Sequence, residues 1–249
     1  MSGNGTKPLE KNELKPWQRQ HWCLPKQIDV GFVAAMEDVL TVYEQGYEEA
    51  YPQVCLDEKL VSLHADVVDP LPVQPGQPER VDYEYKRMGT ANLFVMVERL
   101  AGYRHVAVTE RRTAADYARQ LQWLADVRYP QAKKIRLVQD NLNTHRLANL
   151  YLVFPPAEAR RLTERFELHF TPTHGSWLNM AEIEIGVFER GCLTRRVPDL
   201  GVLQQRVAAL ERERNQTQAT IHWRFTTLDA RQKLSRLYPK LDTAEQKVL

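Results

Sequence analysis

The segment of residues 135–145 constrains the fold more than any other part of the chain. It opens with Ile-Arg-Leu-Val-Gln, an apolar run that favours a β-strand, and it reaches Asp140 just before a turn and a helical pattern. A carboxylate at the carboxyl end of a buried strand lies where open α/β sheets place their ligands. Asp140 is therefore the first candidate for chemistry. An equally compatible interpretation is that Asp140 or Asn143 caps the helix that follows.

Strands are also predicted before this segment. Residues 51–59 form a short apolar run that ends in acids, and strand alternation places Cys55 and Asp57 on one face with Leu56 and Glu58 on the other. Two further β-favouring runs, at residues 91–100 and 104–109, are separated by Ala-Gly-Tyr and predict a hairpin. The prolines and glycine of residues 66–82 predict a loop between the first strand and this hairpin.

Helices and one more strand follow the hairpin. Thr113 with Asp116 is typical of a helix N-terminus and predicts a helix over residues 114–127. Residues 145–164 have a helical pattern that is interrupted near two prolines, and residues 166–170 alternate as a fifth strand. Three antiparallel strands followed by alternating helices and strands are typical of a ribonuclease-H-like fold. We therefore expect an α/β protein with a mixed five-stranded sheet, its first three strands antiparallel, flanked by helices.

The chain divides into three predicted parts. Residues 1–50 form a polar tail, over residues 1–16, and an amphipathic linker helix with apolar side chains three and four positions apart. Residues 51–200 form the α/β core. Residues 201–249 contain two helical patterns and more basic than acidic side chains, although the net charge of the whole chain is only +2. This distribution permits a nucleic-acid partner without requiring one.

Composition excludes several classes of protein. The 3 cysteines include no Cys-x-x-Cys pair, which argues against a disulfide framework or a zinc ribbon. A zinc site built from Cys55, His64 and Cys192 is disfavoured by their scattered spacing. No apolar run approaches the roughly 18 residues of a membrane span, and the start of the chain has no signal-peptide core. We expect a soluble protein of the reducing cytoplasm with no membrane partner.

Paired carboxylates suggest phosphodiester chemistry. Such reactions commonly use two divalent ions held by acids from separate elements. Asp57 and Asp140 follow two strands that would be neighbours, and a third acid is expected from the helix after the fifth strand. There Glu182 and Glu184 point in nearly opposite directions, since residues two apart on a helix differ by about 200°. Glu182 also suits a capping box with Asn179 as the N-cap, a role that needs no metal.

The residues around these acids resemble those of a known family. Asp57 in Cys-Leu-Asp-Glu-Lys, Asp140 in Asp-Asn-Leu-Asn-Thr-His and Glu182 in His-Gly-Ser-Trp-Leu-Asn-Met-Ala-Glu are similar to the three catalytic motifs of DDE transposases. The resemblance is to bacterial insertion-sequence transposases related to the mariner superfamily, and it spans residues 12–239. It implies that these three acids are catalytic and bind two Mg²⁺ (or Mn²⁺) ions, and it favours Glu182 over Glu184.

The resemblance also implies an activity and partners. Such an enzyme cleaves DNA at the ends of an insertion sequence and transfers the 3′-hydroxyl to another strand. The implied partners are double-stranded DNA, as terminal inverted repeats and as target, and a second copy of the chain in a homodimer on DNA. The segment before Asp57 is shorter than the helix-turn-helix region with which such transposases begin. The chain is therefore interpreted as one half of a split reading frame, with a separately encoded helix-turn-helix half, as a truncated element or as an excised domain. The implied location is the bacterial cytoplasm, in association with the nucleoid.

Weaker candidates and alternatives accompany this interpretation. Substrate or supporting roles are possible for Asn141, His145 and Asn179, although turn and helix-start chemistry suits them equally. Candidate DNA contacts are Lys59, Arg195, Arg196 and Arg224, for which a solvated charged surface is the alternative. The competing functions are a ribonuclease-H-like hydrolytic nuclease and a truncated, inactive DNA-binding protein derived from an element.

Overall fold

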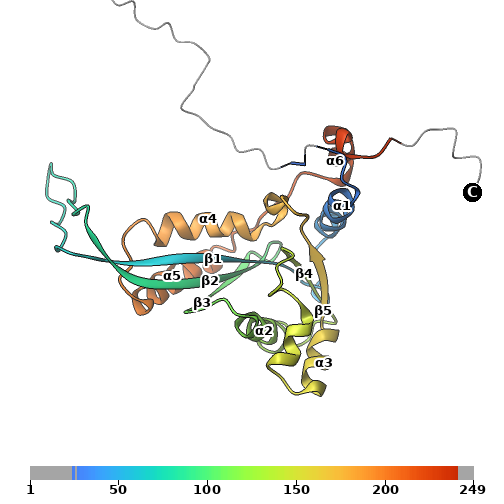
Figure 1. The fold of residues 1–249 in the computed structure, drawn as a ribbon, viewed down its shortest axis with the longest axis horizontal. Helices are drawn as coiled ribbons and strands as arrows, with labels where there is room; N and C mark the ends of the chain where they lie inside the picture. The colour runs from blue at the N-terminus through green and yellow to red at the C-terminus, as the bar shows by residue number, and fades with distance from the viewer. Residues whose placement is uncertain (1–23, 26, 241–249) are drawn as a thin grey trace, which may run out of the picture.

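The structure, a computed structural model, describes residues 24–25 and 27–240 and is built on one mixed sheet of five strands (Figure 1). The spatial order is β3-β2-β1-β4-β5. The strands are β1 (Gln53–Asp66), β2 (Tyr85–Glu98), β3 (Tyr103–Thr109), β4 (Ile135–Gln139) and β5 (Phe166–Phe170). The first three strands are antiparallel, while β4 runs parallel to both β1 and β5. The predicted arrangement of the sheet is thereby confirmed. The polar tail predicted at residues 1–16 lies outside the described residues.

The hairpin of β1 and β2 is longer than the sequence pattern indicated. The first strand was predicted to end at residue 59 and continues to Asp66, and the second begins at Tyr85 rather than near residue 91. The six residues that open β2 are exposed, so they carry no buried apolar pattern from which a strand could be predicted. Residues 67–84 connect the two strands as a loop that extends away from the rest of the molecule (Figure 1).

Helices cover both faces of the sheet. The α-helices are α1 (Val30–Glu44), α2 (Ala114–Trp123), α3 (Pro156–Glu164), α4 (Ala181–Cys192), α5 (Leu200–Gln216) and α6 (Thr227–Lys233). A π-helical turn, η1 (Leu124–Arg128), extends α2, and 3₁₀ turns form η2 (Leu147–Leu152), η3 (Ser176–Leu178) and η4 (Ser235–Leu237). The predicted capping box of Thr113 and Asp116 starts α2. The helical pattern at residues 145–164 is interrupted at the two prolines, as expected.

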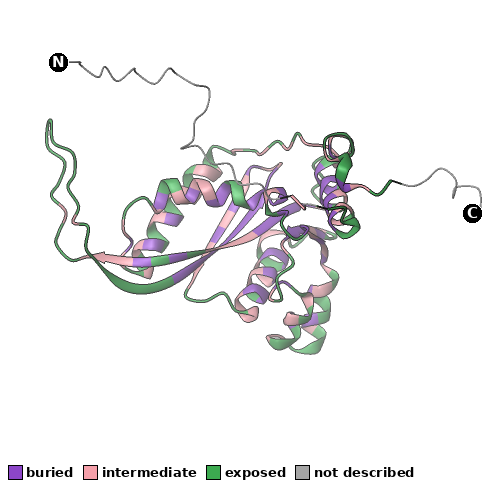
Figure 2. Ribbon diagram, turned by 45° about the horizontal axis from the view of Figure 1, so that its top comes forward, coloured by how far each residue is buried: buried purple, intermediate pink, exposed green. Residues whose placement is uncertain are grey.

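Side chains of β2 alternate between the two faces, and this alternation separates two apolar clusters. Phe94 packs with Tyr117 of α2, whereas Val95 packs with Phe188 of α4 and Leu203 of α5. The two clusters therefore cover both faces of the sheet, and buried residues occupy its centre (Figure 2).

A third cluster joins the two ends of the described chain. Met36 and Leu40 of α1 pack with Cys55 and Val138 of the sheet and with Ala230 of α6. The linker helix predicted within residues 17–50 begins at Val30, and Tyr47, which the pattern included, lies beyond its end and is 59% exposed. Figure 1 shows α1 and α6 side by side at one end of the sheet.

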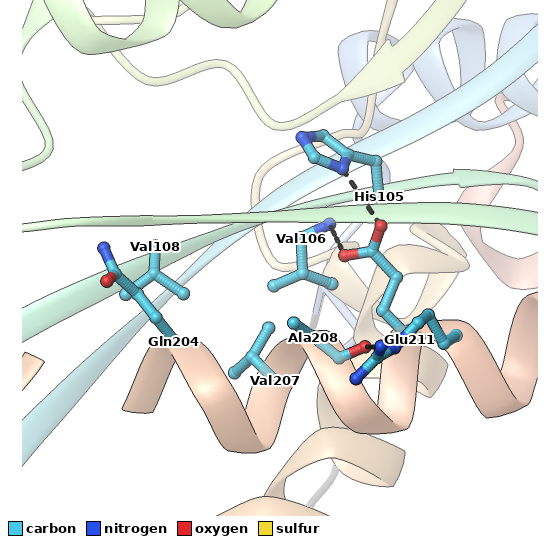
Figure 3. Close-up of a pocket in the computed structure, with 8 residues that line it drawn as sticks. His105, Val106, Val108, Gln204, Val207, Ala208 and Glu211 are labelled. Atoms are coloured by element: carbon cyan, nitrogen blue, oxygen red, sulfur yellow. Dashed lines mark hydrogen bonds and ion pairs between the residues drawn. The ribbon is translucent and has the colours of Figure 1, made fainter. Parts of the chain in front are cut away.

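Helix α5 covers the free edge of β3 (Figure 3). Glu211 accepts a hydrogen bond from the backbone N–H of Val106 at 3.0 Å, and its other oxygen lies 3.1 Å from Nδ1 of His105. Asn215 accepts from the backbone N–H of Arg104 at 2.9 Å. An edge strand whose N–H groups are taken up by side chains is protected from pairing with another chain. The contacts of α5 therefore protect the edge of β3.

Candidate active site

The parallel pairing of β1 and β4 brings two of the predicted acids to the same place. Cys55 pairs with Val138 in the register of these strands. Asp57 and Asp140 each follow two positions later, so both carboxylates leave the sheet at the same level and on neighbouring strands. The expectation that these two strand positions meet is confirmed by the register.

Two hydrogen bonds fix the carboxylate of Asp57. Its Oδ1 accepts from the backbone N–H of Glu58 at 2.8 Å, and its Oδ2 accepts from Nδ2 of Asn179 at 3.0 Å. The same Nδ2 donates to the carbonyl of Leu56 at 2.8 Å, and Asn179 is 1% exposed. Asn179 therefore ties the start of α4 to the strand that carries Asp57.

The alternative interpretation of Glu182, a capping box with Asn179 as the N-cap of α4, is wrong. The N-cap of this helix is Met180, whose own side chain makes no capping hydrogen bond. Asn179 lies one position earlier, where its Oδ1 accepts from the N–H of Ala181 at 3.1 Å and its amide faces Asp57. The capping interpretation fails because the buried contact with β1 fixes the orientation of the Asn179 side chain. Glu182 is thereby released from a capping role.

Glu182 and Glu184 occupy opposite environments, as their helical spacing predicted. Glu182 is exposed in the first turn of α4, and its charge acts on Asp57. Glu184 is 0% exposed and forms ion pairs with Arg104, at 3.0 Å, and with Arg214. A carboxylate that balances two guanidinium groups in the interior is not available to a substrate. Glu182 is the acid of this pair that faces the site.

The surroundings of Asp57 oppose its ionisation. Burial and the charges of Glu182, Asp140 and Glu58 raise its pKa to about 7, although the hydrogen bond from the N–H of Glu58 acts in the other direction. Three carboxylates thus gather around Asp57 closely enough to repel its negative charge. Perturbed carboxyl groups of this kind are enriched at functional sites.

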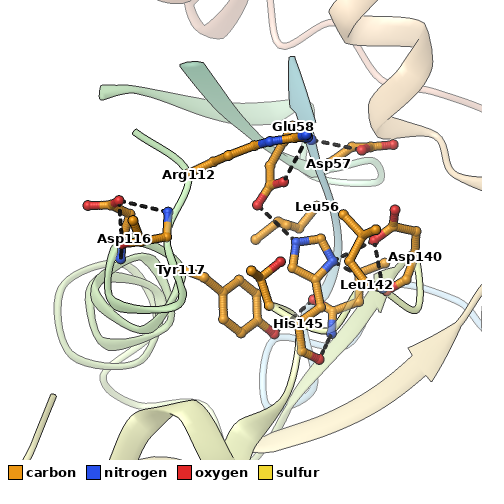
Figure 4. Close-up of polar contacts among 12 residues, drawn as sticks. Leu56, Asp57, Glu58, Arg112, Asp116, Tyr117, Asp140, Leu142 and His145 are labelled. Atoms are coloured by element: carbon orange, nitrogen blue, oxygen red, sulfur yellow. Dashed lines mark hydrogen bonds and ion pairs between the residues drawn. The ribbon is translucent and has the colours of Figure 1, made fainter. Parts of the chain in front are cut away.

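The imidazole of His145 lies between the carboxylates of Glu58 and Asp140 and contacts both (Figure 4). Its side chain is 0% exposed, with Nε2 at 2.9 Å from Glu58 Oε1 and Nδ1 at 2.5 Å from Asp140 Oδ1. Burial lowers the pKa of His145, but its hydrogen bonds to Asp140 and Glu58 outweigh burial and raise that pKa to about 9. At neutral pH the imidazole is therefore charged and donates from both nitrogens.

The chemical type of the side chains of Asp57, Asp140 and Glu182 suits a divalent ion. Among the residues that the structure describes, no group of three or more His, Cys, Asp or Glu side chains is arranged to hold a metal ion by itself. Mg²⁺, however, is commonly held by one or two protein carboxylates, while water and substrate phosphate complete its shell. Asp57, Asp140 and Glu182 supply hard oxygen donors, and the repulsion that raises the pKa of Asp57 is what a cation between them relieves.

The weaker candidates are placed less uniformly. Asn141 is exposed in the turn after Asp140. Lys59 forms an ion pair with Glu189, and Arg195 forms one with Glu79 at 3.1 Å while remaining 74% exposed.

Arg196 holds the long loop in place. It pairs with Asp66 at 2.6 Å and donates to the carbonyls of Asp82 and Glu84. These contacts give Arg196 a structural role in the chain itself. Arg224 is exposed.

The sequence itself matches a known family over this part of the fold. A profile of the family described as DDE superfamily endonuclease matches residues 52–204, more than half of the chain. The chain belongs to the DDE superfamily endonucleases. The matched range contains Asp57, Asp140 and Glu182, together with Glu58, His145 and Asn179 that contact them.

Solved structures of Mos1, a mariner transposase, have a similar fold. The protein in the Mos1 strand transfer complex is 17% identical, with a TM-score of 0.53, over 84% of this chain and 63% of that chain. The Mos1 paired end complex with Mn is also 17% identical, with a TM-score of 0.47, over 84% of this chain and 67% of that one. The likeness to the strand transfer complex confirms the ribonuclease-H-like fold for this DDE endonuclease. The chain spans less than two thirds of the length of that relative.

No curated protein matches the sequence. Within residues 24–25 and 27–240, none of the helices has the length and apolar character needed to cross a membrane.

Sequence reasoning missed two contributors to this site. Glu58 was recognised only as a flanking residue, and Gln139 was not considered. Gln139 donates to the carbonyl of His145 at 3.1 Å and accepts from the hydroxyl of Tyr117 at 2.9 Å. The alternation of β1 did place Glu58 opposite Asp57, on the face where Tyr117 and His145 lie, but it did not identify a partner.

Proposed function

We propose that this DDE endonuclease is the catalytic part of a transposase, which cleaves DNA at the ends of an insertion sequence and joins the freed 3′-hydroxyl to target DNA. The observation that carries the proposal is the meeting of Asp57 and Asp140 at one level of the sheet, with the charge of Glu182 acting on Asp57. The family match and the fold shared with a strand transfer complex support the same function.

Asp57, Asp140 and Glu182 are the residues that would hold two divalent ions. When bound, Mg²⁺ or Mn²⁺ would lower the pKa of an attacking water and stabilise the charge on the leaving oxygen. The chain contributes positioning. Asn179 holds Asp57 in one orientation, and Glu182 reaches the site from a helix anchored at its start by Asn179.

The proposed partners follow from the reaction. Double-stranded DNA would be both substrate and target, and two copies of the chain would act on paired ends. A protein with this substrate would be located with the nucleoid in the cytoplasm. Lys59, Arg195 and Arg224 are the candidate backbone contacts, since each is at least partly exposed. A separately encoded helix-turn-helix protein would recognise the terminal repeats.

The test is a pair of assays on one DNA. A duplex carrying the sequence that flanks the gene is incubated with Mg²⁺, first intact to measure nicking, then with a recessed 3′-hydroxyl to measure joining to a plasmid. Asp57→Asn, Asp140→Asn and Glu182→Gln should each lower both activities by at least about a thousandfold without lowering Tm by more than a few degrees. Glu213→Gln, an exposed acid on α5, is the matched control and should retain activity.

The assays separate the competing functions. Nicking without joining would indicate a hydrolytic endonuclease, and DNA binding with neither activity would indicate an inactive derivative. Full nicking by any of the three acid variants would remove that residue from the proposed site.

A further inference from the structure

The carboxylates of Asp57 and Asp140 are held by different kinds of contact. Asp57 is held by the amide of Asn179 and a backbone N–H, both neutral donors. Asp140 belongs to a loop, its side chain is 34% exposed, and its close partner is the imidazole of His145. The orientation of Asp140 therefore depends on how firmly His145 itself is held.

Three contacts hold His145 besides those that its Nδ1 makes with Asp140. The carboxylate of Glu58 accepts a hydrogen bond from Nε2 of His145. The ring of Tyr117 lies against the imidazole with a centroid separation of 4.8 Å, and Gln139 donates a hydrogen bond to the backbone carbonyl of His145. Glu58 is the only charged group among these three, and its side chain is 3% exposed. A histidine whose far nitrogen is fixed by a buried carboxylate has a defined ring orientation, a device common behind ligand histidines.

The burial of Glu58 is itself unusual. Its Oε2 is buried and has no hydrogen-bond partner among the described residues, and the guanidinium of Arg112 is 4.0 Å away and half exposed. A buried carboxylate with one unsatisfied oxygen lowers stability. The unsatisfied Oε2 is unfavourable for the fold, and the contact of the other oxygen with His145 offers a reason for this residue.

The bridge also determines which oxygen of Asp140 is occupied. The contacts of its side chain with His145 and with the N–H of Leu142 both fall on Oδ1. Within the described chain, no hydrogen bond or ion pair occupies Oδ2 of Asp140. Figure 4 shows Glu58, His145 and Asp140 in one line, with Asp57 on the far side of β1 from the imidazole.

We propose that Glu58 is a positioning residue, which acts through His145 to orient the Asp140 carboxylate toward a divalent ion. This inference rests on the proposed function. Asp57 and Glu58 then have different roles in the site, because side chains alternate along β1. The carboxylate of Asp57 would bind the ion, and that of Glu58 supports Asp140 through His145.

The experiment measures Mn²⁺ binding to the full chain by electron paramagnetic resonance, together with the Mg²⁺ concentration that gives half-maximal nicking. Glu58→Ala should weaken Mn²⁺ binding and raise the Mg²⁺ half-saturation about 10- to 100-fold. Glu58→Gln keeps an acceptor for Nε2 and should recover part of this loss. Glu110→Ala, an exposed acid in the loop before α2, should match wild type.

A double-mutant cycle separates positioning from a direct role. If Glu58 acts through His145, the double variant Glu58→Ala with His145→Gln should bind Mn²⁺ no more weakly than His145→Gln alone. Additive losses would overturn the proposal, as would wild-type Mn²⁺ binding by Glu58→Ala. Failure of the proposed function is distinguishable. Wild-type Mn²⁺ binding and nicking without strand joining would overturn the transposase function and leave the role of Glu58 testable, whereas a wild-type chain that binds no Mn²⁺ would overturn both proposals. Glu58→Gln keeps the test informative if Glu58→Ala does not fold.

Discussion

Glu182 and Glu184 lie two positions apart on α4 and belong to different parts of the molecule: Glu182 is exposed beside Asp57, and Glu184 is buried between Arg104 and Arg214. Their substitution should therefore separate activity from stability. Glu182→Gln should abolish nicking and leave Tm unchanged. Glu184→Gln should lower the free energy of unfolding by about 3–5 kcal/mol, because it leaves buried guanidinium groups without a balancing charge.

Urea denaturation and nicking assays on both variants check this contrast. Glu189→Gln, on the same helix and partly exposed, is the control for any general effect of removing an acid from α4. Equal loss of stability in Glu182→Gln and Glu184→Gln would contradict the assignment.

Asn179 offers a second contrast through its contacts with Leu56, Asp57 and Ala181. Asn179→Ala removes these bonds from a buried position and should lower the free energy of unfolding by about 1–3 kcal/mol. Asn179→Asp keeps an acceptor for the N–H of Ala181 but places another carboxylate beside Asp57. The added charge should raise the pKa of Asp57 further and move the pH profile of nicking to higher pH, which rate measurements between pH 6 and about 9 would detect.

The order of the strands along the chain could be predicted because each strand contains a local pattern of apolar side chains that become buried. The fifth strand was expected at residues 166–170 and is found there, since its apolar and polar side chains alternate. The outer part of β2 was missed because its side chains are exposed and only backbone pairing with β1 holds it.

The acids of the site could be predicted for a related reason, since topology alone brings the ends of neighbouring parallel strands together. Their supports could not. Glu58 and His145 are far apart in the sequence, and the pairing of two polar side chains leaves no periodic signal. The orientation of Asn179 likewise depends on a contact with β1, which the local capping pattern does not contain.

Gly102 should tolerate no side chain. It occupies the turn between β2 and β3 with φ +62, and a Cβ there would overlap the backbone of Gln218. Gly102→Ala should lower the free energy of unfolding by about 1–3 kcal/mol, from the left-handed backbone and the displacement of Gln218. Gly46→Ala is the matched control, because nothing lies within 4 Å of its added carbon. Similar urea midpoints for the two variants would contradict the close packing of this turn.

The raised pKa of Asp57 predicts how stability and ion binding depend on pH. In the folded, metal-free chain this pKa is about 7, above the ordinary value of 3.8, so the folded state holds a proton that the unfolded state has released between these values. The free energy of unfolding contributed by this group is therefore present below pH 4 and is lost as pH rises to about 7.

Asp57→Asn removes the carboxylate, and with it the decrease in the free energy of unfolding that occurs as pH rises. With EDTA present, the variant should be more stable than wild type at pH 7.5, and the difference should shrink toward pH 4. The difference is at most a few kcal/mol, because one pKa unit corresponds to about 1.4 kcal/mol. Wild-type Mn²⁺ affinity should rise with pH up to about 7 and then level, since below that pH the ion displaces a proton from Asp57. Thermal melts at both pH values and Mn²⁺ titrations check the two effects. A pH-independent Mn²⁺ affinity between pH 5 and about 7 would show that Asp57 is already ionised and that the neighbouring acids do not act on it as inferred.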